Sequence, residues 1–114
     1  MSEFEYQSVD PINREQLIRD LDSNDAQTVA DALYSASRYD EDTMWIEDQC
    51  LTRLTSPEVK VRWAAATCLG DLAFSRRSLN IKRVIPALEA ATADKSIADP
   101  ASFSLSMVKQ FLGS

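Results

Sequence analysis

The chain has 114 residues, of which 45% are hydrophobic and 26% are charged, values typical of one globular domain. It contains no histidine and only two glycines, Gly70 and Gly113. The lack of histidine excludes His-based triads, imidazole general bases and imidazole zinc sites. Two isolated glycines exclude a Walker phosphate loop and a dinucleotide-binding fingerprint. We therefore predict a single noncatalytic domain over residues 1–114, without a cofactor or a bound metal.

The sequence carries no signal for secretion or membrane insertion. It opens with MSEFEYQSVDP, which has neither a basic start nor an apolar secretory segment. No stretch approaches the roughly 18 consecutive apolar residues of a membrane span. The two cysteines, Cys50 and Cys68, lie inside apolar segments rather than in a close pair. We expect a cytoplasmic protein without membrane contact and with two buried thiols; one disulfide between them is the alternative.

The formal net charge of −6 is unevenly distributed along the chain. Residues 1–50 carry 13 acidic side chains and three arginines, a balance of −10, whereas residues 51–114 carry nine basic and five acidic side chains, a balance of +4. The acidic total disfavours direct binding to nucleic acid or anionic lipid. An acidic half favours a basic protein partner, because complementary potentials accelerate encounter. Alternatively, the carboxylates stabilise the first turns of helices.

Apolar residues recur at the three- and four-residue spacing of half-buried helices. No segment alternates with period two, so the predicted class is all-α. After a polar arm over residues 1–10, we expect six helices: one over about 11–21, one from the capping run 22–25 to about 38, one from the break at 39–42 to Leu54, one over about 57–74, one over 81–93, and one from the start signal at 99–100 to 112.

Two proline positions bear on the helix boundaries. Ser56 and Pro57 predict that Ser56 caps the fourth helix and that Pro57 occupies its first position, where the missing N–H is not needed. Pro86 falls inside the fifth helix, where proline costs about 3 kcal/mol unless it makes a kink or lies near the first turn. Two helices show clear apolar stripes, predicted from Val61, Ala65, Cys68, Leu69 and Leu72 in the fourth and from Phe103, Leu105, Val108, Phe111 and Leu112 in the sixth.

A repeat is visible in the helix pattern. Leu21, Leu54 and Leu88 each close a helix before a polar turn, and they are 33 and 34 residues apart. Each is followed by a second helix rich in alanine or other small residues. Three helix pairs at this spacing are the minimum that can stack into a short solenoid with a shared core. A plain six-helix bundle is the alternative.

The segment 56–70, SPEVKVRWAAATCLG, resembles the HEAT-repeat signature: a turn with proline, a Val-Arg pair, small residues one turn later, and Leu-Gly. The resemblance implies a short right-handed α-solenoid of about three HEAT-like pairs, with the second helix of each pair on the concave surface. It also implies that Arg62 bonds the inter-helix turns. Ser56 stands where the family often has aspartate, which leaves that ion pair open.

A narrower resemblance rests on residues 31–36, on Trp45 with residues 49–51, and on residues 61–70. These segments look like those of small bacterial HEAT-like immunity proteins, which are encoded beside polymorphic or contact-dependent growth-inhibition toxins. This resemblance implies a noncatalytic protein that binds and neutralises a cognate toxin domain. The alternative within the same fold is a general HEAT-like adaptor or assembly factor. A helical-repeat DNA glycosylase or lyase would need a basic cleft and usually a longer chain.

Carboxylates and amphipathic aromatic rings are the side chains that point to a binding surface. We expect eight of them to contact a basic toxin domain, plausibly a nuclease: Asp31, Tyr34, Tyr39, Asp40, Asp42, Trp45, Glu47 and Trp63. For Trp63, core packing between repeats is an equal alternative. The acidic run 40–42 lacks the spacing and glycine of a calcium loop. The basic residues Arg76, Arg77, Lys82 and Arg83 suggest a solvated loop more than a phosphate site.

Overall fold

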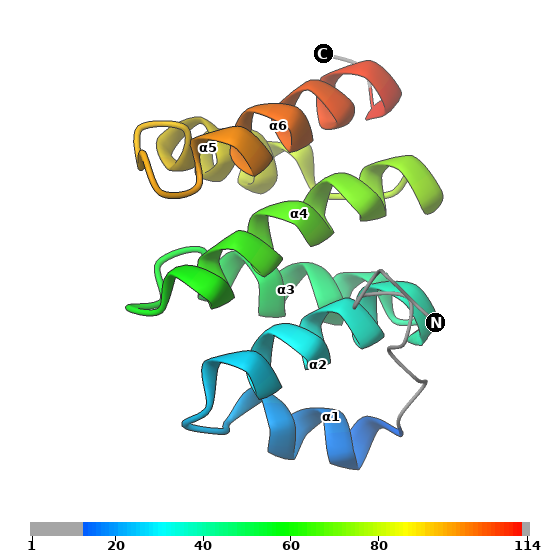
Figure 1. Ribbon diagram of the computed structural model, residues 1–114. Coiled ribbons are helices and arrows are strands. Elements are labelled where there is room, and N and C mark those ends of the chain that lie inside the picture. The colour runs from blue at the N-terminus through cyan, green and yellow to red at the C-terminus, as the bar shows by residue number, and fades with distance from the viewer. Residues whose placement is uncertain (1–12, 113–114) are drawn as a thin grey trace, which may run out of the picture.

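The computed structural model describes residues 13–112, and these residues form six helices and no strand (Figure 1). The all-α prediction is therefore confirmed for this part of the chain. The predicted arm over residues 1–10 lies outside the described residues. The helices are α1 (Arg14–Leu21), α2 (Ala26–Tyr39), α3 (Thr43–Arg53), α4 (Val59–Ser75), α5 (Ile81–Ala91) and α6 (Ala98–Leu112).

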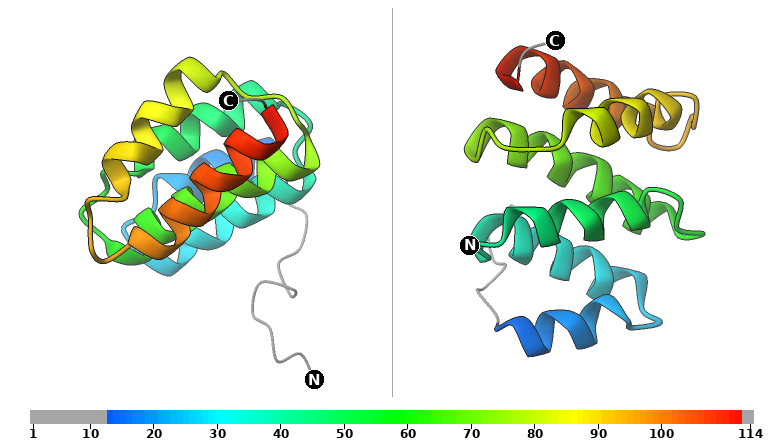
Figure 2. Two further views of the ribbon diagram at one scale, coloured as in Figure 1. Left: turned by 90° about the horizontal axis from the view of Figure 1, so that it is seen from above. Right: turned by 180° about the vertical axis from the view of Figure 1, so that it is seen from behind.

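The helices form three successive pairs, α1 with α2, α3 with α4, and α5 with α6, each joined by a short turn (Figures 1 and 2). The second helices α2, α4 and α6 lie side by side along the molecule, and α4 occupies the middle, in contact with α2, α3 and α6. This order agrees with the repeat in the sequence. The assignment to a right-handed HEAT solenoid stays a prediction.

The core follows the predicted apolar stripe of α4. Val61, Ala65, Cys68, Leu69 and Leu72 are all buried. The three repeat leucines are buried as well, with Leu21 ending α1, Leu54 capping α3 and Leu88 lying one turn before the end of α5. Cys50 and Cys68 are fully buried and unbridged. A hydrogen bond with the Cys68 thiol, together with burial, raises the pKa of Cys50 well above its usual value. Both cysteines therefore act as small core side chains rather than as reactive thiols.

The closest approach between repeats lies where α6 crosses α4. The Ser104 hydroxyl of α6 is buried and donates a 2.6 Å hydrogen bond to the carbonyl oxygen of Ala66 in α4. A β-carbon at Gly70 would lie 3.0 Å from the Ser104 Cα and closer still to its hydroxyl. Glycine is therefore required at position 70 because there is no room for a methyl group between the two backbones.

Helix capping is largely as the sequence predicts, with one correction. The Asp25 side chain caps α2 by accepting from the Thr28 N–H at 3.0 Å. The prediction for α4 is wrong: this helix begins at Val59, two residues later than expected, and Glu58 is its N-cap without a side-chain hydrogen bond. Ser56 instead accepts from the Glu58 N–H at 3.1 Å, which forms a separate turn before the helix.

Pro86 is accommodated inside α5, which runs unbroken from Ile81 to Ala91. Pro86 and Lys82, four residues before it, are both exposed. Water can therefore satisfy the Lys82 carbonyl, which loses its helical donor to the proline ring. The last helix begins at Ala98, slightly earlier than predicted, so that Asp99 lies in its first turn, where the helix dipole favours a carboxylate.

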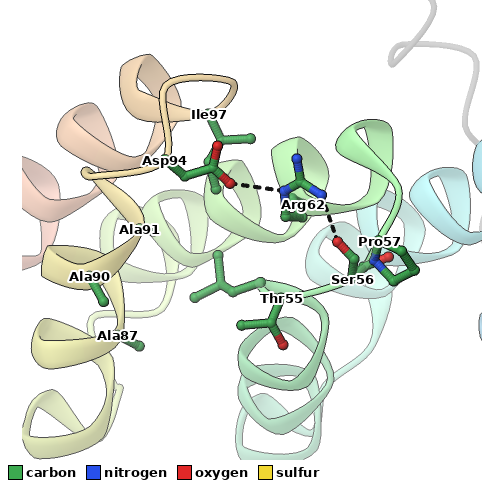
Figure 3. Close-up of a pocket in the computed structure, with 10 residues that line it drawn as sticks. Thr55, Ser56, Pro57, Arg62, Ala87, Ala90, Ala91, Asp94 and Ile97 are labelled. Carbon is green, nitrogen blue, oxygen red and sulfur yellow. Dashed lines mark hydrogen bonds and ion pairs between the residues drawn. The ribbon is translucent and has the colours of Figure 1, made fainter.

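Arg62 joins the turns of neighbouring repeats, as the HEAT resemblance implies. Its Nη1 donates to the Ser56 carbonyl at 2.7 Å and its Nη2 to the Ser96 hydroxyl at 2.9 Å. Its Nε lies 3.0 Å from a carboxylate oxygen of Asp94, so the aspartate partner comes from the following turn rather than from position 56. Figure 3 shows Arg62 between these turns, beside a hollow of about 410 Å³ whose lining includes Ala87, Ala90 and Ala91 of α5.

The contact between α4 and α6 generates a stability prediction. We expect Gly70→Ala to lower the free energy of unfolding by about 1–3 kcal/mol through overpacking, although alanine is intrinsically the better helix former by about 1 kcal/mol. Urea unfolding followed by circular dichroism measures the change. The loss should shrink in a Ser104→Gly background, where the crowding side chain is absent. An equal loss in both backgrounds would show that crowding at this contact is not the cause.

Candidate functional site

The eight residues expected from the sequence fall into two regions. Asp31, Tyr34 and Trp63 lie on the outward sides of α2 and α4, whereas Tyr39, Asp40, Asp42, Trp45 and Glu47 lie in or near the turn between α2 and α3. Within these regions some side chains are exposed and others are held by internal contacts. This distinction decides which residues a partner can reach.

The first region contains a shallow hollow of about 390 Å³ between α2 and α4, which we call the α2–α4 hollow. Tyr34 and Trp63 supply its aromatic walls. Trp63 is 43% exposed, so it is not the fully buried core residue that the alternative interpretation required. Tyr34 is half-buried, and burial raises its pKa to about 12, so its hydroxyl stays protonated at physiological pH. The complete lining is Gln27, Ala30, Tyr34, Val59, Lys60 and Trp63.

The second region is organised around Arg14 of α1. The Arg14 guanidinium donates two hydrogen bonds to the Asp40 carboxylate, at 3.1 and 2.9 Å, and lies 3.6 Å from a carboxylate oxygen of Asp42. The same guanidinium lies 3.9 Å from the ring centroid of Trp45. The Arg14 hydrogen bonds hold the pKa of Asp40 below its usual value. Asp40 and Trp45 therefore fix α1 against the turn between α2 and α3.

Asp42 and Tyr39 remain accessible beside this cluster. Asp42 caps α3 by accepting from the Trp45 N–H at 3.1 Å, but its side chain is still 53% exposed. Tyr39, at the end of α2, is 46% exposed. Glu41 between them is also exposed. This turn thus offers two carboxylates and one phenol ring to a partner.

Glu47 is not at the surface, contrary to the expectation that it faces a partner. Its side chain is buried and accepts a 2.8 Å hydrogen bond from the backbone N–H of Asn80 at the start of α5. Arg83 of α5 lies 3.4 Å from the other carboxylate oxygen and 2.8 Å from the exposed Asp48. Glu47 therefore joins α3 to α5, a role that the sequence does not reveal because its partners are 33 and 36 residues away.

The basic residues of the second half are also used internally. Arg76 donates to the Ser37 carbonyl at 3.0 Å, to the Asp40 carbonyl, and to the Thr43 hydroxyl at 3.0 Å, so it closes the turn between α2 and α3. Arg83 pairs with α3 as described above. Arg76 and Arg83 are therefore not simply solvated, and Arg83 lies in the first turn of α5 rather than in a loop.

Sequence reasoning missed two exposed aromatic residues, Phe74 and Phe103, which are 55% and 65% exposed. Phe103 belongs to the apolar stripe predicted for α6, and Ser104 beside it takes the buried position against α4. Phe74 packs edge-on against Phe111, with ring centroids 5.4 Å apart. Arg77, which has a left-handed backbone φ of 53°, lies 4.6 Å from the Phe111 centroid. The outward sides of α4 and α6 therefore carry more aromatic surface than predicted.

Residues 13–112 include no group of three or more cysteine, aspartate or glutamate side chains placed to hold a metal ion. In the same range, no helix is both long enough and apolar enough to cross a membrane.

The Arg14–Asp40 pair predicts a pH dependence. The folded-state pKa of Asp40 is lowered, so its stabilisation is complete above the unfolded pKa of about 4 and is lost as the pH falls further. We expect Asp40→Asn to cost about 1 kcal/mol at pH 7. Thermal unfolding of both proteins between pH 7 and 2 measures the difference, which should disappear at low pH. Asp31→Asn is the control and should cost under about 0.5 kcal/mol. A pH-independent cost of Asp40→Asn would contradict the assignment.

No family model and no curated protein matches this chain. Among solved structures, it is similar to a chain of the crystal structure of a CDI complex from Cupriavidus taiwanensis LMG 19424. The two chains are 24% identical, with a TM-score of 0.83, and the match covers 95% of this chain and 97% of the other. This likeness shows that the described helices are arranged in the same fold as a chain of that complex.

Proposed function

We propose that this chain is the immunity protein of a contact-dependent growth-inhibition pair and that it neutralises a cognate toxin domain by binding it. The observation that carries the proposal is the shared fold with a chain of a CDI complex, over 95% of this chain and 97% of the other. The resemblance of residues 31–36 and 61–70 to small HEAT-like immunity proteins supports the same role. That resemblance rests on the sequence and is independent of the shared fold.

The proposed activity is binding rather than catalysis. The sequence has no histidine, and both thiols are fully buried, where they cannot act as nucleophiles. Exposed aromatic rings beside charged groups are instead the features that dominate protein interfaces. Of the eight expected residues, we retain Asp31, Tyr34, Tyr39, Asp42 and Trp63 as partner contacts. Asp40 and Trp45 position the turn, and Glu47 is left out because it is buried.

We propose that the toxin domain is basic, as a nuclease that binds phosphate would be. Asp31, Glu41 and Asp42 are exposed carboxylates on or near α2, and such groups attract a surface that also attracts phosphate. The internal pairing of Asp40 and Glu47 reduces this acidic surface without removing it. Electrostatic steering would let the immunity protein capture its toxin rapidly, since complementary fields raise association rates toward about 10⁸ M⁻¹s⁻¹.

Co-expression with the toxin domain encoded next to this chain's own gene tests the function. The proposal expects that the chain restores growth to cells producing the toxin and copurifies with it at equal stoichiometry. The Gly70→Ala variant, if destabilised as predicted above, should protect less at elevated temperature. Failure of the well-folded wild-type chain to bind the toxin domain would overturn the proposal and leave the adaptor alternative.

Charge removal at the acidic turn tests steering. Glu41→Gln together with Asp42→Ser removes two exposed carboxylates, while serine still caps α3. We expect association with the toxin domain to slow about two- to fivefold at low salt, with little change in dissociation. Stopped-flow mixing at several salt concentrations measures both rates. Glu58→Gln with Glu89→Gln removes the same charge elsewhere and is the control. Equal association rates for the two double variants would contradict steering by this turn.

A further inference from the structure

The walls of the α2–α4 hollow are aromatic and apolar. Tyr34 and Ala30 face it from α2, and Trp63 and Val59 face it from α4. Trp63 and Val59 are 43% and 45% exposed, although both are large hydrophobic side chains. An exposed indole and an exposed aliphatic side chain in a concave site are typical of a pocket that receives an anchor side chain of a protein partner.

Charges near the hollow favour a cation at its Tyr34 end. Asp31, on the turn of α2 before Tyr34, is exposed and has one carboxylate oxygen bonded to the Gln27 amide at 2.8 Å. The negative charges of Asp31 and Asp71 both act on Tyr34 and contribute to its raised pKa. Asp71 also faces Arg38 across the adjoining part of the same two helices.

The other end of the hollow carries Lys60, an exposed cation. Its charge acts on Asp25 at the N-terminus of α2 and helps to keep the pKa of that carboxyl low. The hollow therefore has a basic end at Lys60 and an aromatic end at Tyr34 and Trp63. The exposed Asp31 lies beside the aromatic end, outside the lining itself. An incoming cation is expected at the aromatic end, because Lys60 opposes it at the other.

The second region of this protein already holds an arginine between an indole ring and a carboxylate. Arg14 lies 3.9 Å from the Trp45 ring centroid while its guanidinium nitrogens bond to Asp40. A guanidinium suits such a site because it is planar, stacks on aromatic rings and bonds carboxylates in parallel, whereas a lysine ammonium is a compact, strongly hydrated charge. The α2–α4 hollow is lined by an indole and a phenol, and no arginine is among the described residues that line it. The Asp31 carboxylate lies at its rim, bonded to the lining residue Gln27.

We propose that the α2–α4 hollow binds an arginine side chain presented by the toxin domain, with the guanidinium against Trp63 and Tyr34 and bonded to Asp31. This inference rests on the proposed function for the identity of the partner. Ala30 and Val59 would cover the aliphatic part of the arginine. This contact would connect electrostatic steering with specific binding. The acidic first half attracts a cationic toxin surface, and the α2–α4 hollow then binds one arginine of that surface.

A peptide probe tests the hollow without the toxin. We would titrate the ¹⁵N-labelled full chain with acetyl-Gly-Arg-Gly-amide and follow the two indole N–H signals, assigned with Trp63→Phe. The proposal expects a saturable shift of the Trp63 signal at millimolar peptide, little change at Trp45, and no saturable shift with the uncharged citrulline peptide. Asp31→Asn should weaken binding about threefold or more, and Lys60→Gln should tighten it about twofold, since it removes the opposing cation.

The controls separate this site from general attraction to an acidic protein. Asp99→Asn removes an exposed carboxylate from α6 and Phe103→Ala removes an exposed ring from α6, and both variants should bind the arginine peptide as the wild type does. Equal shifts with the citrulline peptide, or unchanged binding by Asp31→Asn, would overturn the proposal. So would the absence of any saturable shift at Trp63.

The toxin domain supplies the second arm of the test. Trp63→Ala should weaken binding of the toxin domain about tenfold or more, and Phe103→Ala should weaken it less. Full affinity in the Trp63→Ala variant would overturn the arginine site while leaving the immunity function intact. If the wild-type chain does not bind the toxin domain, the proposed function fails, and the peptide titration still decides whether the hollow recognises arginine.

Discussion

The packing of α4 between α2 and α6 is the contact on which the rest of the structure depends. Small side chains allow it: Ala64, Ala65 and Ala66 are fully buried, and Gly70 admits Ser104 of α6 without room for a methyl group. Because α4 buries these sides against its neighbours, its outward side carries Trp63 and Phe74 to the surface. The rotation of α4 about its axis therefore explains both features: its small residues face the neighbouring helices, and its aromatic residues face the surface.

The acidic character of the first half serves the fold as well as the surface. Arg14 bonds Asp40, and Arg83 reaches Glu47 from α5, so part of the excess negative charge holds the helix pairs together. Removing one partner of a buried pair usually costs more than the pair contributes, because the remaining charge is left without compensation. Other carboxylates of the first half are exposed, among them Asp31, Glu41 and Asp42, and these remain available for recognition.

Local patterns allowed much of the fold to be predicted, and non-local contacts explain what was missed. Apolar spacing identified the six helices and the buried side of α4, and the Asp25 cap followed from a four-residue polar run. Glu47 was misplaced because its partners lie on α5, where no nearby sequence signal points to them. The buried position of Ser104 was not predicted, since only the close approach to α4 selects it. Ser56 was not the cap of α4, because its hydroxyl closes a separate turn with the Glu58 N–H and its carbonyl accepts from Arg62.

We propose that this chain neutralises a toxin domain by covering it with the outward sides of α2 and α4. Hydroxyl-radical footprinting of the complex with the toxin domain measures that contact most directly, because oxidation reports the solvent access of individual aromatic side chains. The account predicts that Trp63 and Tyr34 become several-fold less reactive in the complex while Trp45, already covered by Arg14, changes little. Unchanged oxidation of Trp63 in a stoichiometric complex would contradict it.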